Sequence, residues 1–115
     1  MDSLNLPHGD NADVSRNKLE GYVLNPLHPD GQHKARVFLS ALGISSENAD
    51  LLRAQLLQTA REGEATERGT NEFGTRYEIV FEMTGPNGKS ALVTSGWFID
   101  SGGDTPRLTS CYVRL

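Results

Sequence analysis

Two separated groups of side chains in this chain have the chemistry needed to handle a phosphate. The first is His33-Lys34-Ala35-Arg36, and the second is Pro106-Arg107-Leu108-Thr109-Ser110-Cys111-Tyr112. Histidine both gives and takes protons near neutral pH, while lysine, arginine, threonine and tyrosine bind or hydrogen-bond an oxyanion. Together these residue types are compatible with acid–base chemistry on a phosphodiester, provided that the fold brings them together.

Composition limits the classes of protein to which the chain can belong. Its 115 residues match one ordinary domain, and 37% hydrophobic with 23% charged residues suit a small folded core. The net charge of -4 argues against a protein that coats nucleic acid by charge alone, but it leaves room for a small basic site. The sequence has no apolar run near 18 residues, and it has no basic start followed by an apolar stretch, as a signal peptide would. We therefore expect a cytoplasmic protein without a membrane segment.

The first half of the chain has helical character. Residues 1–17 lack a sustained apolar period, so we expect a flexible polar leader followed by a single domain over 18–115. Residues 19–24 suggest a short extended segment before a proline-rich loop. Helices are predicted over 32–42 and 46–62 from the spacing of their apolar residues. The stripes expected to be buried are Ala35, Phe38, Leu39 and Leu42 in the first helix, and Ala49, Leu52, Leu56 and Ala60 in the second.

The second half alternates with the period of strands. Residues 76–84 place apolar side chains at every second position, 85–88 form a turn with an Asn-Gly pair, and 90–100 return as a partner strand. A further strand is predicted over 107–114, and the glycine-rich segment 66–74 is a loop with room for a short edge strand. The predicted fold is α+β, with two N-terminal helices packed on one face of a three- to four-stranded antiparallel β-meander.

Several familiar site motifs are incomplete. Gly88-Lys89-Ser90 resembles the end of a phosphate-binding P-loop but lacks the first glycine of that motif. His28 and His33 have no neighbouring cysteine to complete a metal site, and we predict neither a metal nor a cofactor. The single cysteine, Cys111, cannot form an intramolecular disulfide, and its place in a strand favours a core residue over a nucleophile.

The motifs support a family resemblance that covers about residue 18 to the C-terminus. They are Leu24-Asn25-Pro26, His28-Pro29, Gly31, His33-Lys34-Ala35-Arg36-Val37-Phe38, Gly74-Thr75-Arg76-Tyr77, Gly85-Pro86-Asn87-Gly88, Trp97 and Pro106 to Tyr112. The chain resembles a family of small bacterial domains of unknown function, whose members often sit beside a second small protein. That arrangement implies a toxin–antitoxin pair with a small antitoxin-like partner.

The chain is also similar, more weakly, to the superfamily of small ribonucleases and toxins that includes barnase, EndoU, colicin nucleases and RelE. Those proteins place helices before a curved antiparallel sheet, and many of the toxins end in a Thr-x-x-Tyr-like strand close to Thr109 and Tyr112. This similarity implies metal-independent cleavage of RNA by its own 2′-hydroxyl, which needs a base, an acid and cations around the phosphate.

Site residues are assigned on that basis. The expected catalytic residues are His33, Arg107, Thr109 and Tyr112, and the expected substrate-binding residues are Lys34, Arg36 and Arg76. Strict alternation would place Arg107 and Thr109 on one face of the last strand and Tyr112 on the other, unless a bulge re-aims the tyrosine.

Structural roles for the same residues stay open. His33 could hydrogen-bond the preceding loop, and Arg36 and Arg107 could pair with acidic side chains. Two hypotheses follow: a small ribonuclease-like toxin neutralised by a partner, and a non-catalytic interaction domain that binds another protein through a sheet face or strand edge.

Overall fold

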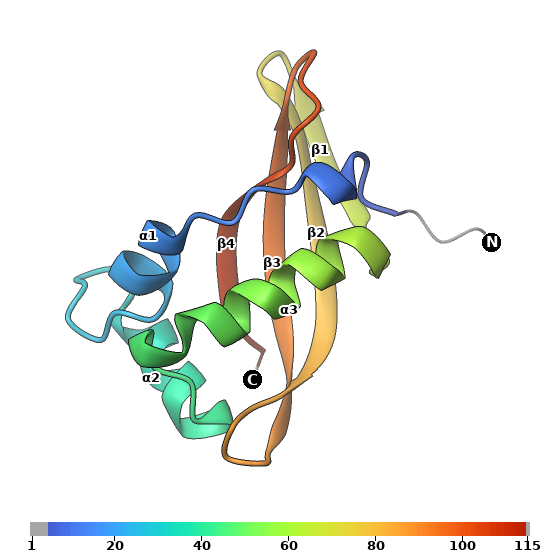
Figure 1. The fold of residues 1–115 in the computed structure, drawn as a ribbon. Helices are drawn as coiled ribbons and strands as arrows, with labels where there is room; N and C mark the ends of the chain where they lie inside the picture. Colours follow the sequence, from blue (N-terminus) through green and yellow to red (C-terminus); the bar gives the residue numbers. More distant parts are fainter. Residues whose placement is uncertain (1–4, 115) are drawn as a thin grey trace.

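A four-stranded antiparallel sheet, covered on one face by helices, forms the framework of the protein (Figure 1). The computed structural model describes residues 5–114. The strands are β1 (Thr66–Asn71), β2 (Gly74–Thr84), β3 (Ser90–Asp100) and β4 (Arg107–Val113), and they lie in the order β1-β2-β3-β4. This confirms the predicted α+β meander, and segment 66–74 does contribute an edge strand.

All helical segments precede the sheet in the chain. They are a 3-10 turn (Gly9–Asn11), α1 (Arg16–Lys18), a π-helical segment (Leu19–Val23), α2 (Gln32–Leu42), a 3-10 turn (Ser46–Asn48) and α3 (Ala49–Glu62). Helix α2 packs against β4 and β3, and α3 packs against β2. No helix within residues 5–114 combines the length and apolar character needed to cross a membrane.

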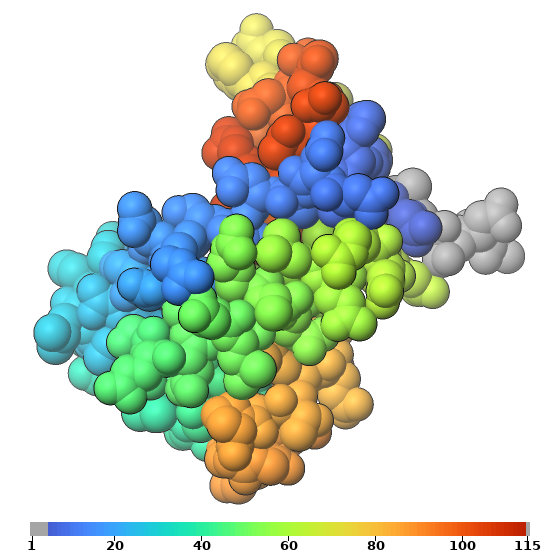
Figure 2. Space-filling view, viewed as in Figure 1, coloured from blue at the N-terminus to red at the C-terminus, as the bar shows by residue number. Residues whose placement is uncertain are grey.

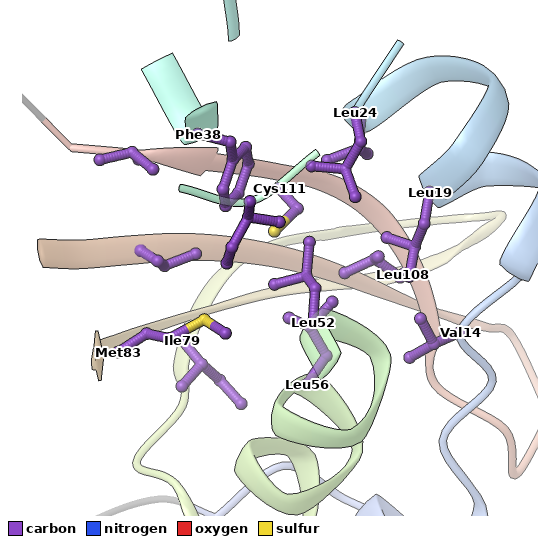
Figure 3. Close-up of a cluster of buried hydrophobic side chains, with 14 of the residues drawn as sticks. Val14, Leu19, Leu24, Phe38, Leu52, Leu56, Ile79, Met83, Leu108 and Cys111 are labelled. Atoms are coloured by element: carbon purple, nitrogen blue, oxygen red, sulfur yellow. The ribbon is translucent and has the colours of Figure 1, made fainter. Parts of the chain in front are cut away.

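The core lies between these helices and the inner face of the sheet (Figure 3). Alternation along the strands sends every second side chain inward. The strand residues buried there are Ile79, Met83, Val93, Trp97, Leu108, Cys111 and Val113. The apolar stripe of α3 packs against them, and Ala49, Leu52, Leu56 and Ala60 are all buried as predicted.

Helix α2 buries a narrower stripe than its periodicity suggests. Ala35, Phe38 and Leu42 are buried, but Leu39 is 55% exposed. The helix contacts the sheet near its β4 edge, so only part of its apolar face meets the core. The prediction that Leu39 belongs to the buried stripe is therefore wrong.

Segment 19–24 also differs from its prediction, because it is helical instead of extended. Leu19–Val23 forms a π-helical turn that continues α1, and the Leu24 amide donates to the Leu19 carbonyl over 2.8 Å. Leu19, Val23 and Leu24 all enter the core. Their burial outweighs the strand propensity of such a short segment, since tertiary packing routinely overrides local preference.

Residues 5–17, expected to be a flexible leader, pack against the domain. Figure 2 shows this segment, coloured blue, lying between α3 and the chain that enters β4. Leu6 and Val14 are buried. The Asp13 amide donates to the Pro106 carbonyl over 2.8 Å, and the Leu108 amide donates to the Asp13 carbonyl over 3.0 Å. These backbone hydrogen bonds add the segment to the free edge of β4.

The proline-rich loop before α2 is held by its own polar side chains. The Nδ1 atom of His28 accepts hydrogen bonds from the amides of Asp30 and Gly31, over 3.0 and 3.2 Å. The His28 ring also lies edge-on to Tyr22, with their centroids 4.6 Å apart. A Cβ at Gly31 would lie 2.4 Å from the Tyr22 carbonyl oxygen, so only glycine fits there. This loop fixes where α2 begins, and hence where His33 and Lys34 stand.

A buried chain of hydrogen bonds joins β2 and β3 inside the core. The Trp97 indole donates to the Ser95 hydroxyl over 3.0 Å, and that hydroxyl donates to the Ile79 carbonyl over 3.0 Å. Ser95 and Trp97 are both fully buried. The serine therefore satisfies two polar groups that would otherwise be buried without partners.

Ser95→Ala should lower the free energy of unfolding by about 1–3 kcal/mol, because it leaves the Trp97 N–H and the Ile79 carbonyl without their partner. Urea titration followed by fluorescence of the single tryptophan measures this directly. Ser101→Ala, at an exposed position, is the control. Equal stability of the two variants would contradict this account of the core.

His28→Ala should cost roughly 1–2 kcal/mol of stability, because two backbone amides lose their acceptor. The exposed His33 is the matched control, and His33→Ala should leave the melting temperature within about 1–2 °C of the wild type. Thermal melts followed by circular dichroism give both values. A larger loss for His33→Ala than for His28→Ala would reverse the roles of the two histidines.

Candidate functional site

A β-bulge in β4 determines which side chains reach the outer face of the sheet. Trp97 pairs with Leu108 and Gly96 pairs with Ser110, so Thr109 is the extra residue. After the bulge, Cys111 points into the core and Tyr112 stands opposite Thr94 on the outer face. The bulge needed to re-aim the tyrosine is therefore present, and Thr109 and Tyr112 share the outer face.

The outer face holds a polar cleft of about 220 Å³. The residues that line it are Lys34, Arg68, Arg76, Tyr77, Glu78, Thr94, Gly96, Trp97, Thr109, Ser110 and Tyr112. Four of the predicted site residues therefore come together from α2, β2 and β4. Three cationic side chains face one carboxylate, which leaves a local excess of positive charge suited to an anion.

The cleft contains a buried hydroxyl without a partner. Thr94 is 3% exposed, and its Oγ1 makes no hydrogen bond within residues 5–114. Buried polar atoms are nearly always paired, so such an atom calls for an explanation. Thr94 also lines the cleft, so a polar group bound there is one source of the missing partner.

Lys34 and Tyr112 divide this cleft from a neighbouring hollow. The Lys34 ammonium lies over the Tyr112 ring, 5.0 Å from its centroid, and both residues line each space. The second hollow, of about 430 Å³, is more apolar and includes His33, Val37 and Val113. His33 is thus adjacent to the polar cleft, but it is not among the residues that line it.

One ion pair lies in the polar cleft. The Arg68 guanidinium donates to the Glu78 carboxylate over 2.8 Å, and the two side chains are 53% and 29% exposed. Arg68 stands at the register shift of β1, where it faces β2. Arg76, by contrast, makes no ion pair within the described part of the chain.

Two predicted site residues lie outside both spaces. Arg107 pairs with Asp100 over 3.4 Å and stacks on Phe98, with 5.2 Å from its guanidinium carbon to the ring centroid. Arg36 accompanies Gln32 on α2, where its guanidinium donates to the amide oxygen over 3.3 Å. His33 and Arg107 line no common cavity within residues 5–114.

Cys111 of β4 and Tyr77 of β2 have shifted pKa values. Burial raises the pKa of the Cys111 thiol to about 12, so this residue behaves as a core side chain. Burial, and to a lesser degree the Glu67 carboxylate, raise the pKa of the Tyr77 phenol.

Seven residues that line the cleft are not among the predicted site residues: Arg68, Tyr77, Glu78, Thr94, Gly96, Trp97 and Ser110. Glu78 and Arg76 belong to the wet face of a strand whose alternation was recognised. Pairing that face with the outward residues of the 90–100 strand would have found Glu78 and Thr94. The bulges that locate Arg68 and Ser110 have no local signal.

Comparison with known proteins identifies the family of the chain. A family profile matches residues 5–115, nearly the whole sequence. The chain belongs to the family described as a domain of unknown function (DUF6883). This confirms the resemblance to uncharacterised small domains. A comparison of this DUF6883 domain with curated proteins gives no significant match.

A solved structure shares the fold of this DUF6883 domain. It is one chain of a contact-dependent growth inhibition toxin–immunity protein complex from Klebsiella pneumoniae 342. The two chains superpose with a TM-score of 0.67 at 18% identity, over 88% of this chain and 98% of that chain. At this identity the likeness establishes the fold, and the function has to be argued from the cleft.

The Cys111 thiol of this DUF6883 domain should resist modification while the protein is folded. With a pKa of about 12, only on the order of one thiol in 10⁴ is ionised at pH 8. Ellman's reagent at pH 8 should release one equivalent of chromophore in guanidinium and almost none from native protein. Rapid labelling of the native protein would show that the cysteine is accessible.

Proposed function

We propose that this domain is a small metal-independent ribonuclease-like toxin that acts on RNA phosphodiesters and is neutralised by a partner protein. The observation that carries this proposal is the polar cleft on the open sheet face. Lys34, Arg68 and Arg76 line this cleft together with Thr94, whose hydroxyl has no hydrogen-bond partner among residues 5–114. A phosphate matches both the excess of positive charge and the missing hydrogen-bond partner.

The cleft contains the groups that cleavage by the 2′-hydroxyl requires around the phosphate. Lys34 and Arg76 neutralise the negative charge that builds up on the phosphorane. The Thr109 hydroxyl donates a hydrogen bond to a phosphate oxygen, and Tyr112 orients the substrate or stacks on a base. Neither Arg36 nor Arg107 takes part in this arrangement, because both lie outside the cleft.

His33 serves as a proton-transfer group at the edge of the cleft. It stands on the first turn of α2, next to Lys34, and lines the hollow on the other side of the Lys34–Tyr112 pair. An exposed imidazole there can reach a leaving oxygen that extends from a phosphate held in the cleft.

A neutralising partner would cover the same cleft. The fold is shared with a chain from a complex of a growth inhibition toxin and its immunity protein, which supports a module that works with a partner. A partner presenting carboxylates would pair with Lys34, Arg68 and Arg76 and exclude the substrate.

The second candidate function is a non-catalytic interaction domain, and the exposure of β1 favours it. All six residues of Thr66–Asn71 are exposed, and the outer edge of the strand pairs with no other strand among residues 5–114. Such an edge can accept a strand from another protein.

Inducible expression in a bacterial host should arrest growth with cleavage of RNA, and Arg76→Ala should reduce cleavage by about 10²-fold or more. His33→Ala should reduce it by a similar factor, since general acid catalysis contributes about 10²–10⁴-fold. Purified variants and total RNA measure both effects. The matched control is Arg107→Ala, which removes an exposed arginine outside the cleft and should retain activity.

Normal growth and intact RNA at high soluble expression of the wild type would contradict the nuclease and favour the interaction domain. Equal loss of activity in Arg76→Ala and Arg107→Ala, with both proteins folded, would place the site elsewhere on the sheet.

A further inference from the structure

Glu78 is the one carboxylate among the described residues that line the polar cleft. It projects from β2 on the outer face, directly opposite Gly96 of β3. Glycine presents no side chain there, and the Ser110 hydroxyl takes up the room above it, so Glu78 borders the part of the cleft that Ser110 also lines. Thr94, two residues before Gly96 on the same strand, borders that space with its unpartnered hydroxyl.

Arg68, the ion-pair partner of Glu78, can leave the carboxylate to bind another anion. Arg68 holds the carboxylate over 2.8 Å, but it comes from the exposed edge strand and is itself 53% exposed. Ion pairs in contact with solvent hold their partners weakly. A phosphodiester that enters the cleft gives Arg68 a second anion to bind. Its two non-bridging oxygens can accept two parallel hydrogen bonds from the guanidinium.

We propose that Glu78, and not His33, takes the proton from the attacking 2′-hydroxyl of the RNA. This inference rests on the proposed function and names a further catalytic residue for it. Glu78 lies in the same cleft as the groups that hold the phosphate, whereas His33 lies beyond the Lys34–Tyr112 pair. The base must be within reach of the hydroxyl next to the phosphate, and Glu78 is the carboxylate that lines the same cleft as the cations proposed to hold that phosphate.

Two proton transfers accompany the exchange of bonds at phosphorus. The O–H bond of the 2′-hydroxyl breaks, its proton passes to the Glu78 carboxylate, and the 2′-oxygen forms a bond to phosphorus. The bond from phosphorus to the 5′-oxygen breaks, and that oxygen takes a proton from the His33 imidazolium. The products are a 2′,3′-cyclic phosphate and a 5′-hydroxyl. Exchange with water then returns both side chains to their starting states.

The test compares Glu78→Gln with Glu82→Gln. Glu82 lies four residues along β2 on the same outer face, but it is not among the residues that line the cleft. Cleavage of total bacterial RNA gives the rate, and a 2′-O-methyl RNA oligonucleotide, which lacks the attacking hydroxyl, gives the affinity. Glu78→Gln should lose about 10²-fold or more in rate while binding RNA at least as tightly as the wild type. Glu82→Gln should match the wild type in both.

A chemical rescue separates catalysis from a structural role. Adding formate to Glu78→Ala should restore part of the lost rate, because a free carboxylate can enter the space left by the removed Glu78 carboxylate and accept the proton. Loss of affinity in parallel with rate, without rescue by formate, would assign Glu78 to holding Arg68 and overturn the inference.

Two further outcomes are distinguishable from each other. Full cleavage by Glu78→Gln would overturn the role of Glu78 while leaving the proposed nuclease intact. A wild-type protein that is folded and cleaves no RNA would overturn the proposed function itself.

Discussion

One extra residue in the last strand determines both the core and the cleft. Without the bulge at Thr109, strict alternation from Leu108 would turn Cys111 toward solvent and Tyr112 into the core. With it, the two side chains take the opposite faces. Gly96 accommodates the bulge, since a Cβ there would lie 2.4 Å from the Ser110 hydroxyl. The packing of the strand and the chemistry of the outer face therefore depend on the same backbone irregularity.

The sequence predicted those elements whose signals are local. The 46–62 helix has a full stripe of buried alanines and leucines, and the β2–β3 hairpin has period-two alternation around an Asn-Gly turn. Residues 5–17 lack such a signal, because their order comes from backbone hydrogen bonds between Asp13 and a strand some 93 residues later. Pairing over that separation leaves no pattern in the residues themselves. The π-helical turn after α1 is likewise determined by the burial of Leu19 and Val23.

The sequence predicts which residue types the candidate site contains better than it predicts which residues lie together. Lys34, Arg76, Thr109 and Tyr112 were chosen for their chemistry, and the cleft brings these four together. Arg107 was chosen on the same grounds, yet it stands about five residues from Tyr112 along β4, roughly 15 Å away at the rise of a strand. Residue types indicate which groups can do the chemistry, while only strand pairing decides which of them meet.

The charge of the protein and the charge of its cleft differ in sign, and this difference limits which RNA the proposed nuclease could bind. A net charge of -4 repels a polyanion at long range, so bulk attraction to RNA is weak. At short range, Lys34, Arg68 and Arg76 face a single carboxylate within one cleft. Under the proposed function, affinity would have to come from a phosphate bound in the cleft and from the shape of the RNA around it, because the surrounding surface adds no general attraction. For the proposed nuclease, such a balance would favour a particular structured RNA over RNA in bulk, and an acidic partner could close the cleft by pairing with these three cations alone.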